Sequence, residues 1–298
     1  MTFAACLLIL VGVTTYSHNL HSDTIEDKAN SVVLLDMKAS KGSGFFVEPN
    51  IIMTNNHVVA SSDSTIVRFR DGRKIDGKVI ARNDKIDLAL VEISGEEWDN
   101  FENKPKPMDF CPDVNKLPLG TRVVTIGHPL LFDWIASEGI ISRNNFVYSG
   151  GYAYYIVSDN KVYQGNSGGP MIKDTGCVVG ISVQLFNQDG QIYSLSISGA
   201  LVTDVYDRLR KNELDLPRFG AAFSTDDFVI SKLGDESELK NAGLMEGDKI
   251  IQINDTIVRT LFDFVSTVID IEKGEEYRIR VMRDNVLRTY TLVSQNRF

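Results

Sequence analysis

The sequence Gln164-Gly165-Asn166-Ser167-Gly168-Gly169-Pro170 surrounds a single serine with glycines. Glycines in this pattern permit a tight backbone turn that exposes the hydroxyl and points nearby N–H groups at one spot. We predict an oxyanion hole at that spot, formed by Gly165, Asn166 and Ser167, with the N–H groups of Gly165 and Ser167 as donors. Ser167 is therefore a candidate nucleophile.

A serine hydroxyl is a weak nucleophile at neutral pH, so this interpretation requires a base and a carboxylate that orients it. His57 follows the apolar stretch Ile51–Thr54, which places a polar side chain at a rim rather than in a core. Asp87 precedes the apolar stretch Leu88–Val91, so we expect it to be partly buried. His57 is the candidate general base, and Asp87 is the candidate orienting residue.

Each of these motifs has a simpler interpretation when it is taken alone. A single histidine is usually an ordinary polar side chain, an Asp before a strand is usually a turn residue, and Gly-Gly-Pro is a common loop element. The order His57, Asp87, Ser167 on an all-β chain favours a catalytic triad, because chymotrypsin-type barrels use this order.

Residues 31–198 are a succession of short apolar, β-branched stretches separated by Gly, Asn, Asp and Pro, without long helical patterns between them. This spacing predicts an all-β barrel or sandwich. Examples of the expected strands are Ser31–Met37, Gly44–Val47, Ile51–Thr54, Thr65–Arg70, Lys78–Arg82, Leu88–Ile93, Thr121–Ile126, Tyr154–Ser158, Cys177–Leu185 and Ile192–Ile197.

The pattern changes at residue 198. Apolar residues then recur at helical spacing up to Arg210, with Ser198 as the expected N-cap, and Pro217 marks a linker. Roughly 80 residues follow, a plausible size for a small domain. We predict an α+β module with strands at Phe228–Lys232, Lys249–Ile253 and Tyr277–Met282, a helix at Phe262–Ile271 and a hairpin through Asp284-Asn285.

Three blocks together resemble the catalytic motifs of the HtrA (DegP/DegQ/DegS-type) branch of trypsin-like serine proteases. They are Thr54-Asn55-Asn56-His57-Val58-Val59, Asp87-Leu88-Ala89-Leu90 and Gly165-Asn166-Ser167-Gly168-Gly169-Pro170. Lys41–Phe46 and Glu138–Ser142 are similar to further segments of the family, so the likeness runs from about residue 31 to residue 210.

This resemblance implies a mainly β fold, with a chymotrypsin-like double β-barrel protease domain of two perpendicular six-stranded barrels. It also implies ATP-independent cleavage of unfolded proteins and frequently a trimer. Tyr163-Gln164 and Gly127-His128-Pro129-Leu130-Leu131 depart from the family pattern, which has Asn-Pro and Gly-Asn-Pro-Phe-Gly at these places. These departures concern loop regulation and substrate preference.

Lys161, Ile181, Ser182 and Val183 are assigned to the substrate pocket. Lys161 lies six residues before Ser167, where trypsin-like enzymes place the base of the pocket for the residue preceding the cut. We expect it to bias cleavage away from basic side chains or towards acidic ones, by charge complementarity. The alternative is a lysine that extends into solvent.

The C-terminal segment is similar to a PDZ domain. Arg218–Phe223 and the block Ala242-Gly243-Leu244-Met245-Glu246-Gly247-Asp248-Lys249-Ile250 carry this resemblance. It implies that Phe219, Gly220 and Ala221 form the loop that holds a ligand's terminal carboxylate. The alternative is a docking module that binds no peptide. The predicted domains are 1–22 (signal peptide or anchor), 25–214 (protease) and 218–298 (PDZ).

Composition narrows the function classes. The formal net charge of −9 disfavours nucleic acid as a partner, because phosphate binding relies on concentrated Lys and Arg. The apolar run Thr2–Val13 fits a signal peptide, although no Lys or Arg precedes it, and a buried strand or helix is the alternative. We expect export to the periplasm, secretion or membrane anchoring.

The cysteine and histidine spacing predicts no metal site and no cofactor. Cys111 and Cys177 form one possible disulfide pair in an oxidising compartment, and two free buried thiols are the alternative. His18 and His21 near Asp23 could bind a metal, but a solvated leader explains them better.

These observations predict a serine endopeptidase that cuts unfolded or misfolded polypeptides through an acyl-enzyme, with a PDZ module for peptide binding or regulation. Expected partners are polypeptide substrates, a C-terminal peptide ligand at the PDZ module and other copies of the chain. The alternatives are a non-catalytic chaperone or peptide-binding scaffold and a processing protease dedicated to one substrate.

Overall fold

The computed structural model describes residues 24–294, except for 38–39, 130–132, 149–150, 189, 218 and 225–226. The chain divides into two compact units. The first holds Leu88–Asn144, Ile156–Ala200 and the described residues up to Arg82. The second holds Asn83–Asp87, Asn145–Tyr155 and the residues from Leu201 onward. The predicted signal peptide, His18, His21 and Cys6 lie outside the described residues.

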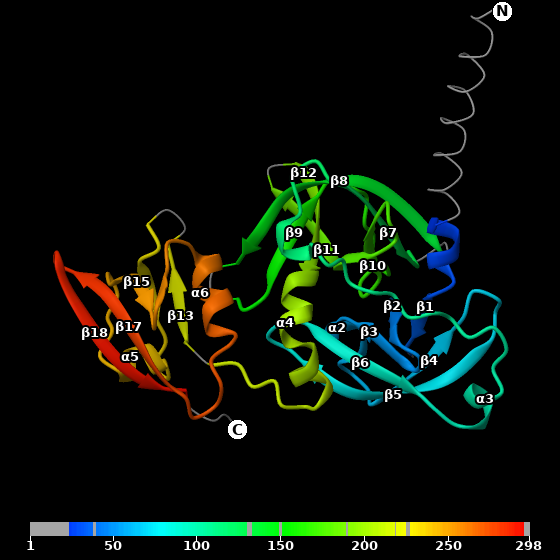
Figure 1. Cartoon of the computed structure of the whole chain (residues 1–298), viewed down its shortest axis with the longest axis horizontal. Helices are drawn as coiled ribbons and strands as arrows, with labels where there is room; N and C mark the ends of the chain where they lie inside the picture. Colours follow the sequence, from blue (N-terminus) through cyan, green and yellow to red (C-terminus); the bar gives the residue numbers. More distant parts are fainter. Residues whose placement is uncertain are drawn as a thin grey trace, which may run out of the picture. The chain divides into compact units, whose positions relative to one another are not determined.

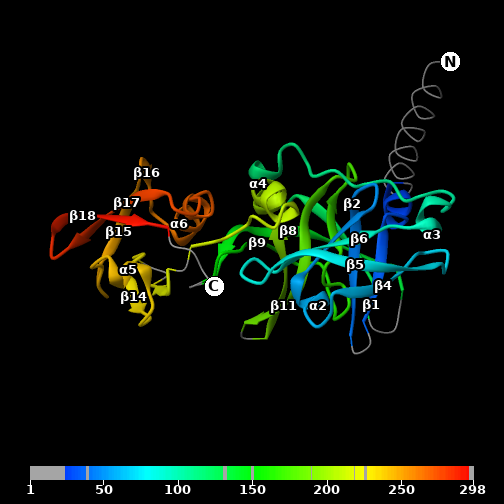
Figure 2. The same ribbon diagram turned by 90° about the horizontal axis from the view of Figure 1, so that it is seen from below.

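Six strands close into a first barrel in the order β1-β2-β3-β6-β5-β4 (Figure 1, blue to cyan). They are β1 (Val32–Asp36), β2 (Lys41–Glu48), β3 (Ile51–Thr54), β4 (Ser64–Arg68), β5 (Lys74–Asn83) and β6 (Leu88–Ile93). In β5 every second side chain is buried, as the period of two of a strand with one solvated face requires. Figure 2 shows β1, β4, β5 and β6 side by side.

Aromatic rings fill one end of the first barrel. Phe46 stacks on Trp98 with ring centroids 5.6 Å apart, and Phe69 lies 4.4 Å from Phe101. Trp98 belongs to the short helix α3 (Glu96–Asp99), which the connection after β6 places against this core. Burial of these rings is a major stabilising contribution to the barrel, because each removes a large apolar surface from water.

Six further strands close into a second barrel in the order β10-β11-β12-β9-β8-β7 (Figure 1, green). They are β7 (Arg122–Gly127), β8 (Ile135–Val147), β9 (Tyr154–Ser158), β10 (Pro170–Lys173), β11 (Val178–Gln188) and β12 (Gln191–Ser198). The two closed six-stranded barrels confirm the predicted fold class. Strands β8 and β10 are not among the expected strands. For β10 the reason is that Gly168-Gly169-Pro170 indicates a loop, yet proline is tolerated as the first residue of a strand.

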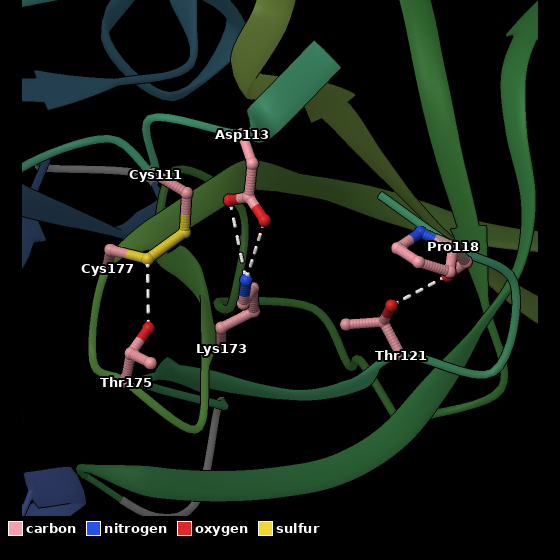
Figure 3. A network of polar contacts seen from close by, with 7 residues as sticks. All are labelled: Cys111, Asp113, Pro118, Thr121, Lys173, Thr175 and Cys177. Carbon is pink, nitrogen blue, oxygen red and sulfur yellow. Dashed lines mark hydrogen bonds and ion pairs between the residues drawn. A yellow bond between two sulfur atoms is a disulfide. The ribbon is translucent and has the colours of Figure 1, made fainter. Parts of the chain in front are cut away.

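A disulfide joins Cys111 to Cys177, with Cα atoms 5.0 Å apart (Figure 3). This resolves the two alternatives for these cysteines in favour of a bridge. The bridge links the segment that connects the two barrels to the start of β11. The same segment contains a 3-10 turn at Val114–Lys116. Lys173 pairs with Asp113 at 3.1 Å beside it.

The second unit contains two small sheets, β13-β14 and β16-β15-β17-β18 (Figure 1, yellow to red). Its strands are β13 (Ala221–Phe223), β14 (Ile230–Leu233), β15 (Lys249–Ile253), β16 (Thr256–Ile257), β17 (Glu276–Arg283) and β18 (Val286–Val293). Its helices are α4 (Gly199–Arg210), whose first two residues belong to the first unit, α5 (Glu238–Asn241) and α6 (Leu261–Val268). No helix among the described residues is both long enough and apolar enough to cross a bilayer.

Local signals in α4 and in the second unit act as the sequence predicts. Ser198 accepts a hydrogen bond from the Ala200 N–H at the start of α4. Asp284 and Asn285 both have positive φ and form the two-residue turn between β17 and β18. Asp248 is fully buried and forms a two-pronged ion pair with Arg283, so the Gly247-Asp248 motif supports the scaffold.

Candidate active site

His57 lies in a single helical turn, α2 (Asn56–Val59), directly after β3. Asn55 is buried and extended, so the chain leaves the barrel wall at this residue and then turns. Val58 and Val59 anchor the turn in the core, whereas the side chain of His57 is exposed. The structure therefore presents His57 at the surface, as a general base requires.

Ser167 lies in a tight turn whose backbone is hydrogen-bonded on both sides. The Asn166 N–H donates to the Tyr163 carbonyl at 3.0 Å, and the Gly169 N–H donates to the Asn166 carbonyl at 2.9 Å. Gly165 and Gly168 have φ values of 103° and 85°, which only glycine adopts readily.

The surrounding space also requires glycine at both positions. A Cβ at Gly165 would lie 2.1 Å from the His128 carbonyl oxygen, and one at Gly168 would lie 2.1 Å from the Ser43 carbonyl oxygen. Neither contact is possible between real atoms. The turn can therefore approach the chain beneath it only because these residues lack side chains.

Two close contacts place the Ser167 turn against the segment that carries His57. A Cβ at Gly168 would lie 2.2 Å from Thr54 Oγ1, three residues before His57. A Cβ at Gly42 would lie 2.6 Å from Val58 Cγ1 and 3.2 Å from the Ser167 carbonyl oxygen. Ser167 and His57 come from different barrels, and the fold brings their segments together.

The hydroxyl of Ser167 donates to the carbonyl oxygen of Val183 at 2.7 Å. Val183 lies at an irregularity in the pairing of β11 with β12, between Ser182 and Gln184, so its carbonyl is available for this contact. Sequence reasoning placed Val183 in the substrate pocket but did not predict this bond.

Asp87 has a left-handed backbone, with φ of 56°, directly before β6. The Asn83 side chain prepares this turn, because its carbonyl accepts hydrogen bonds from the N–H groups of Lys85 and Ile86. Strand β6 pairs with β3 through Ala89 opposite Thr54. Burial raises the pKa of Tyr155 to about 12, and the charge of Asp87 adds to the shift, so the tyrosine stays protonated.

The other predicted pocket residues differ in their surroundings. Ile181 and Ser182 are fully buried on β11, and Ser182 exchanges backbone hydrogen bonds with the Gly168-Gly169 segment. Lys161 is exposed, and its N–H donates to Ser137 Oγ at 2.9 Å. The structure thus joins Ser182 to the nucleophile turn, whereas Lys161 is an exposed residue outside that turn.

Asn160 is a buried polar residue of the second barrel that sequence reasoning missed. It is buried, accepts from the Ser158 hydroxyl at 2.6 Å and donates to Thr125 Oγ1 at 2.7 Å. No sequence motif marks it, because its partner Thr125 lies 35 positions earlier in the chain.

A second candidate site is a cavity of about 440 Å³ within the second unit. The predicted carboxylate-loop residues Phe219, Gly220 and Ala221 line it, together with Tyr152 and Lys85. The N–H of Phe219 donates to the hydroxyl of Tyr152 at 3.2 Å. This part of the predicted loop therefore already has an internal partner.

No cluster of three or more His, Cys, Asp or Glu side chains suited to a metal occurs among the described residues. Hydrolysis by a serine nucleophile needs none.

Residues 42–181 match the family model of the trypsin-like peptidase domain. A probable periplasmic serine endoprotease, DegP-like, from Pseudomonas putida (strain GB-1) is 28% identical over 264 residues, which cover 82% of this chain and 54% of the relative. A relative of the same description from Brucella suis biovar 1 (strain 1330) is 29% identical over 265 residues, covering 83% of this chain and 50% of the relative. The chain spans about half the length of these curated relatives.

Solved structures share the fold. The HtrA-type protease AlgW with tripeptide superposes with a TM-score of 0.79 at 23% identity, covering 93% of this chain and 97% of that one. The serine endoprotease from Yersinia pestis gives a TM-score of 0.70 at 22% identity, covering 92% and 97%. Residues 42–181 thus resemble a trypsin-like peptidase domain in both sequence and fold. The chain is similar in sequence to DegP-like serine endoproteases, and it shares the fold of the HtrA-type protease AlgW.

Proposed function

We propose that the protein is a serine endopeptidase that cleaves unfolded or misfolded polypeptides. The observation that carries this proposal is the glycine-lined turn of Ser167, packed against the segment that presents His57. Homology to DegP-like serine endoproteases supports the same class of reaction.

The proposed reaction proceeds in two steps through an acyl-enzyme. Ser167 Oγ attacks the scissile carbonyl while His57 takes its proton, and Asp87 orients His57 and stabilises its charged form. The N–H groups of Gly165 and Ser167 stabilise the oxyanion. The His57 proton then passes to the leaving amine, and water activated by His57 hydrolyses the ester.

The bond between Ser167 and Val183 bears on the first step. Rotation about the Cα–Cβ bond of Ser167 has to break it before the hydroxyl can donate to His57. Such a rotation crosses only a barrier between staggered side-chain positions, so it is compatible with catalysis.

Extended polypeptides suit this site as substrates. An unfolded chain can lie extended at this site, and its backbone hydrogen bonds then hold it without a strict sequence requirement. The structural neighbours with a bound tripeptide or decapeptide support peptide binding as the shared property.

We propose that residues 25–214 act as the protease domain and residues 218–298 as a PDZ module. The cavity beside Phe219–Ala221 is the candidate site for a peptide C-terminus. A ligand carboxylate has to displace the Tyr152 hydroxyl from the Phe219 N–H. A peptide with a free C-terminus should therefore bind, and its C-terminal amide should not.

We also propose that the protein is exported and assembles with other copies of itself. Its DegP-like relatives are described as periplasmic, and a disulfide between Cys111 and Cys177 is stable in an oxidising compartment.

Proteolysis of unfolded casein tests the proposed function. Wild type should degrade casein, whereas Ser167→Ala and His57→Ala should not, with melting temperatures unchanged. Degradation by Ser167→Ala at the wild-type rate would overturn the assignment of the nucleophile. Casein binding without cleavage by wild type, even with C-terminal peptides added, would favour the non-catalytic scaffold.

A further inference from the structure

A buried hydroxyl links His128 to the turn that carries the candidate nucleophile. Ser43, on β2, has no exposed surface. Its Oγ donates to the carbonyl oxygen of Gly165 at 2.7 Å and accepts from the backbone N–H of His128 at 3.0 Å. The same oxygen lies 3.0 Å from Nδ1 of the His128 ring.

Counting hydrogens fixes the protonation of this ring. The single hydroxyl hydrogen of Ser43 points at Gly165, because a carbonyl oxygen only accepts. The hydrogen bond to His128 then requires a hydrogen on Nδ1. Burial of the ring lowers the pKa of His128 to about 3, with the charge of Arg68 adding to the shift, so the ring is neutral and Nε2 carries no hydrogen.

The far side of the ring agrees with this assignment. Nε2 is buried and has no hydrogen-bond partner among the described residues. The ring meets Trp134 edge to face, with centroids 4.3 Å apart. The polar side of His128 is therefore directed solely at Ser43 within the described part of the chain.

The peptide group between Gly165 and Asn166 is held at both ends. Its carbonyl accepts from Ser43, and its N–H donates to the Tyr163 carbonyl at 3.0 Å. The proposed oxyanion donors, the N–H groups of Gly165 and Ser167, lie on either side of this peptide group. Its orientation therefore limits the directions in which both donors can point.

The backbone of His128 also supports the turn directly. A Cβ at Gly127 would lie 2.9 Å from the Asn166 Cα, and one at Gly165 would lie 2.1 Å from the His128 carbonyl oxygen. Little free space separates the two segments. A change in the His128 side chain can thus alter the position of the Ser167 turn through Ser43.

We propose that His128 is a positioning residue for the oxyanion hole, which acts through Ser43 to hold the Gly165–Asn166 peptide group in its catalytic orientation. His128 does not contact substrate. The inference rests on the proposed protease function, and the competing explanation is a histidine that only fills space between the barrel wall and Trp134.

Two substitutions of His128 separate these explanations. Asn can place its amide nitrogen near the position of Nδ1 and keep the donor, whereas Leu has a similar size and no donor. Positioning predicts that His128→Leu lowers kcat about 10- to 100-fold with little change in KM, below the cost of deleting an oxyanion donor itself. His128→Asn should stay within about threefold of wild type.

Ser43→Ala is a second variant that tests the same inference, because it removes the hydroxyl with almost no change in side-chain volume. It should reduce kcat as much as His128→Leu does. In the double variant the two effects should not add, since His128 acts through Ser43. Ser43→Ala also keeps the test valid if His128→Leu does not fold.

The experiment measures kcat and KM on a casein-derived peptide and the rate at which a fluorophosphonate labels each variant, with melting temperature as the check on folding. Equal activity of His128→Leu or Ser43→Ala and wild type, equal loss in His128→Asn and His128→Leu, or additive losses would overturn the inference. An inactive wild type would instead contradict the proposed function.

Discussion

Ser43 and Gly165 lie 122 positions apart in the sequence, and a hydrogen bond of 2.7 Å joins the hydroxyl of the first to the carbonyl of the second. Ser43 belongs to the first barrel, and Gly165 precedes β10 of the second. The N–H of Ser43 also donates to the Ser167 carbonyl at 2.8 Å. The shape of the nucleophile turn therefore depends on correct packing of one barrel against the other.

Replacing Asp87 by Asn should lower kcat/KM about 10⁴-fold, because an amide stabilises the wrong tautomer of a catalytic histidine and cannot stabilise its charged form. Steady-state kinetics on a casein peptide measures the change. Asp84→Asn is the matched control, since Asp84 is an exposed residue of the same turn. A loss smaller than tenfold in Asp87→Asn would remove Asp87 from the triad.

The charge of Lys161 should influence which bond is cut. Wild type should avoid sites that follow Lys or Arg, and Lys161→Glu should favour them by about tenfold, because the charge at the pocket is reversed. Mass spectrometry of casein digests gives the cleavage profile. Lys116→Glu, an exposed lysine elsewhere in the same unit, is the control. Identical profiles for wild type and Lys161→Glu would show that the side chain only extends into solvent.

His128 should make the protein less stable in acid. Its folded pKa of about 3 lies below the ordinary value of 6.5, so between these values the unfolded chain binds a proton that the folded chain does not. The contribution is complete above pH 6.5 and decreases as the pH falls towards 3, by at most about 1.4 kcal/mol per pH unit.

Urea unfolding of wild type and His128→Asn between pH 7.5 and pH 4.5 tests this dependence. The difference between their free energies of unfolding should shift in favour of His128→Asn as the pH falls. His57→Asn, at an exposed histidine, serves as the control. A difference that does not vary with pH would show that His128 is not held neutral by burial.

The disulfide should contribute substantially to stability. It closes a loop of 66 positions, and the chain-entropy relation gives about 4 kcal/mol for a loop of this length. The variant Cys111→Ser/Cys177→Ser should unfold at lower urea than wild type, and reduced wild type should behave in the same way. Thiol titration of denatured wild type should find no more than the one thiol of Cys6. Detection of three thiols would rule out the bridge.

The elements that depend on local pattern could be predicted from the sequence. Short apolar, β-branched stretches mark most barrel strands, Ser198 marks the start of α4, and Asp284-Asn285 marks a hairpin. Each signal acts within a few residues. The glycines Gly165 and Gly168 around Ser167 are also a local signal, because the turn itself needs their positive φ values.

The parts that depend on distant contacts could not be predicted. The partner of His128 is 85 positions away, so its sequence neighbours Gly127 and Pro129 indicate only a loop. The Phe219 N–H bonds to Tyr152, 67 positions earlier, which no PDZ-like motif reveals. The pairing of Cys111 with Cys177 stayed open for the same reason, since composition does not determine which residues meet.

Covalent labelling of Ser167 tests the central claim most directly. A fluorophosphonate reacts with a serine only where a base and an oxyanion hole activate it. Purified wild type should become labelled, with the added mass located by peptide mass spectrometry on Ser167, whereas His57→Ala should label at least about 100-fold more slowly. Absence of labelling in folded wild type, with and without C-terminal peptides, or a label on a different serine, would contradict the assignment of Ser167 as the nucleophile.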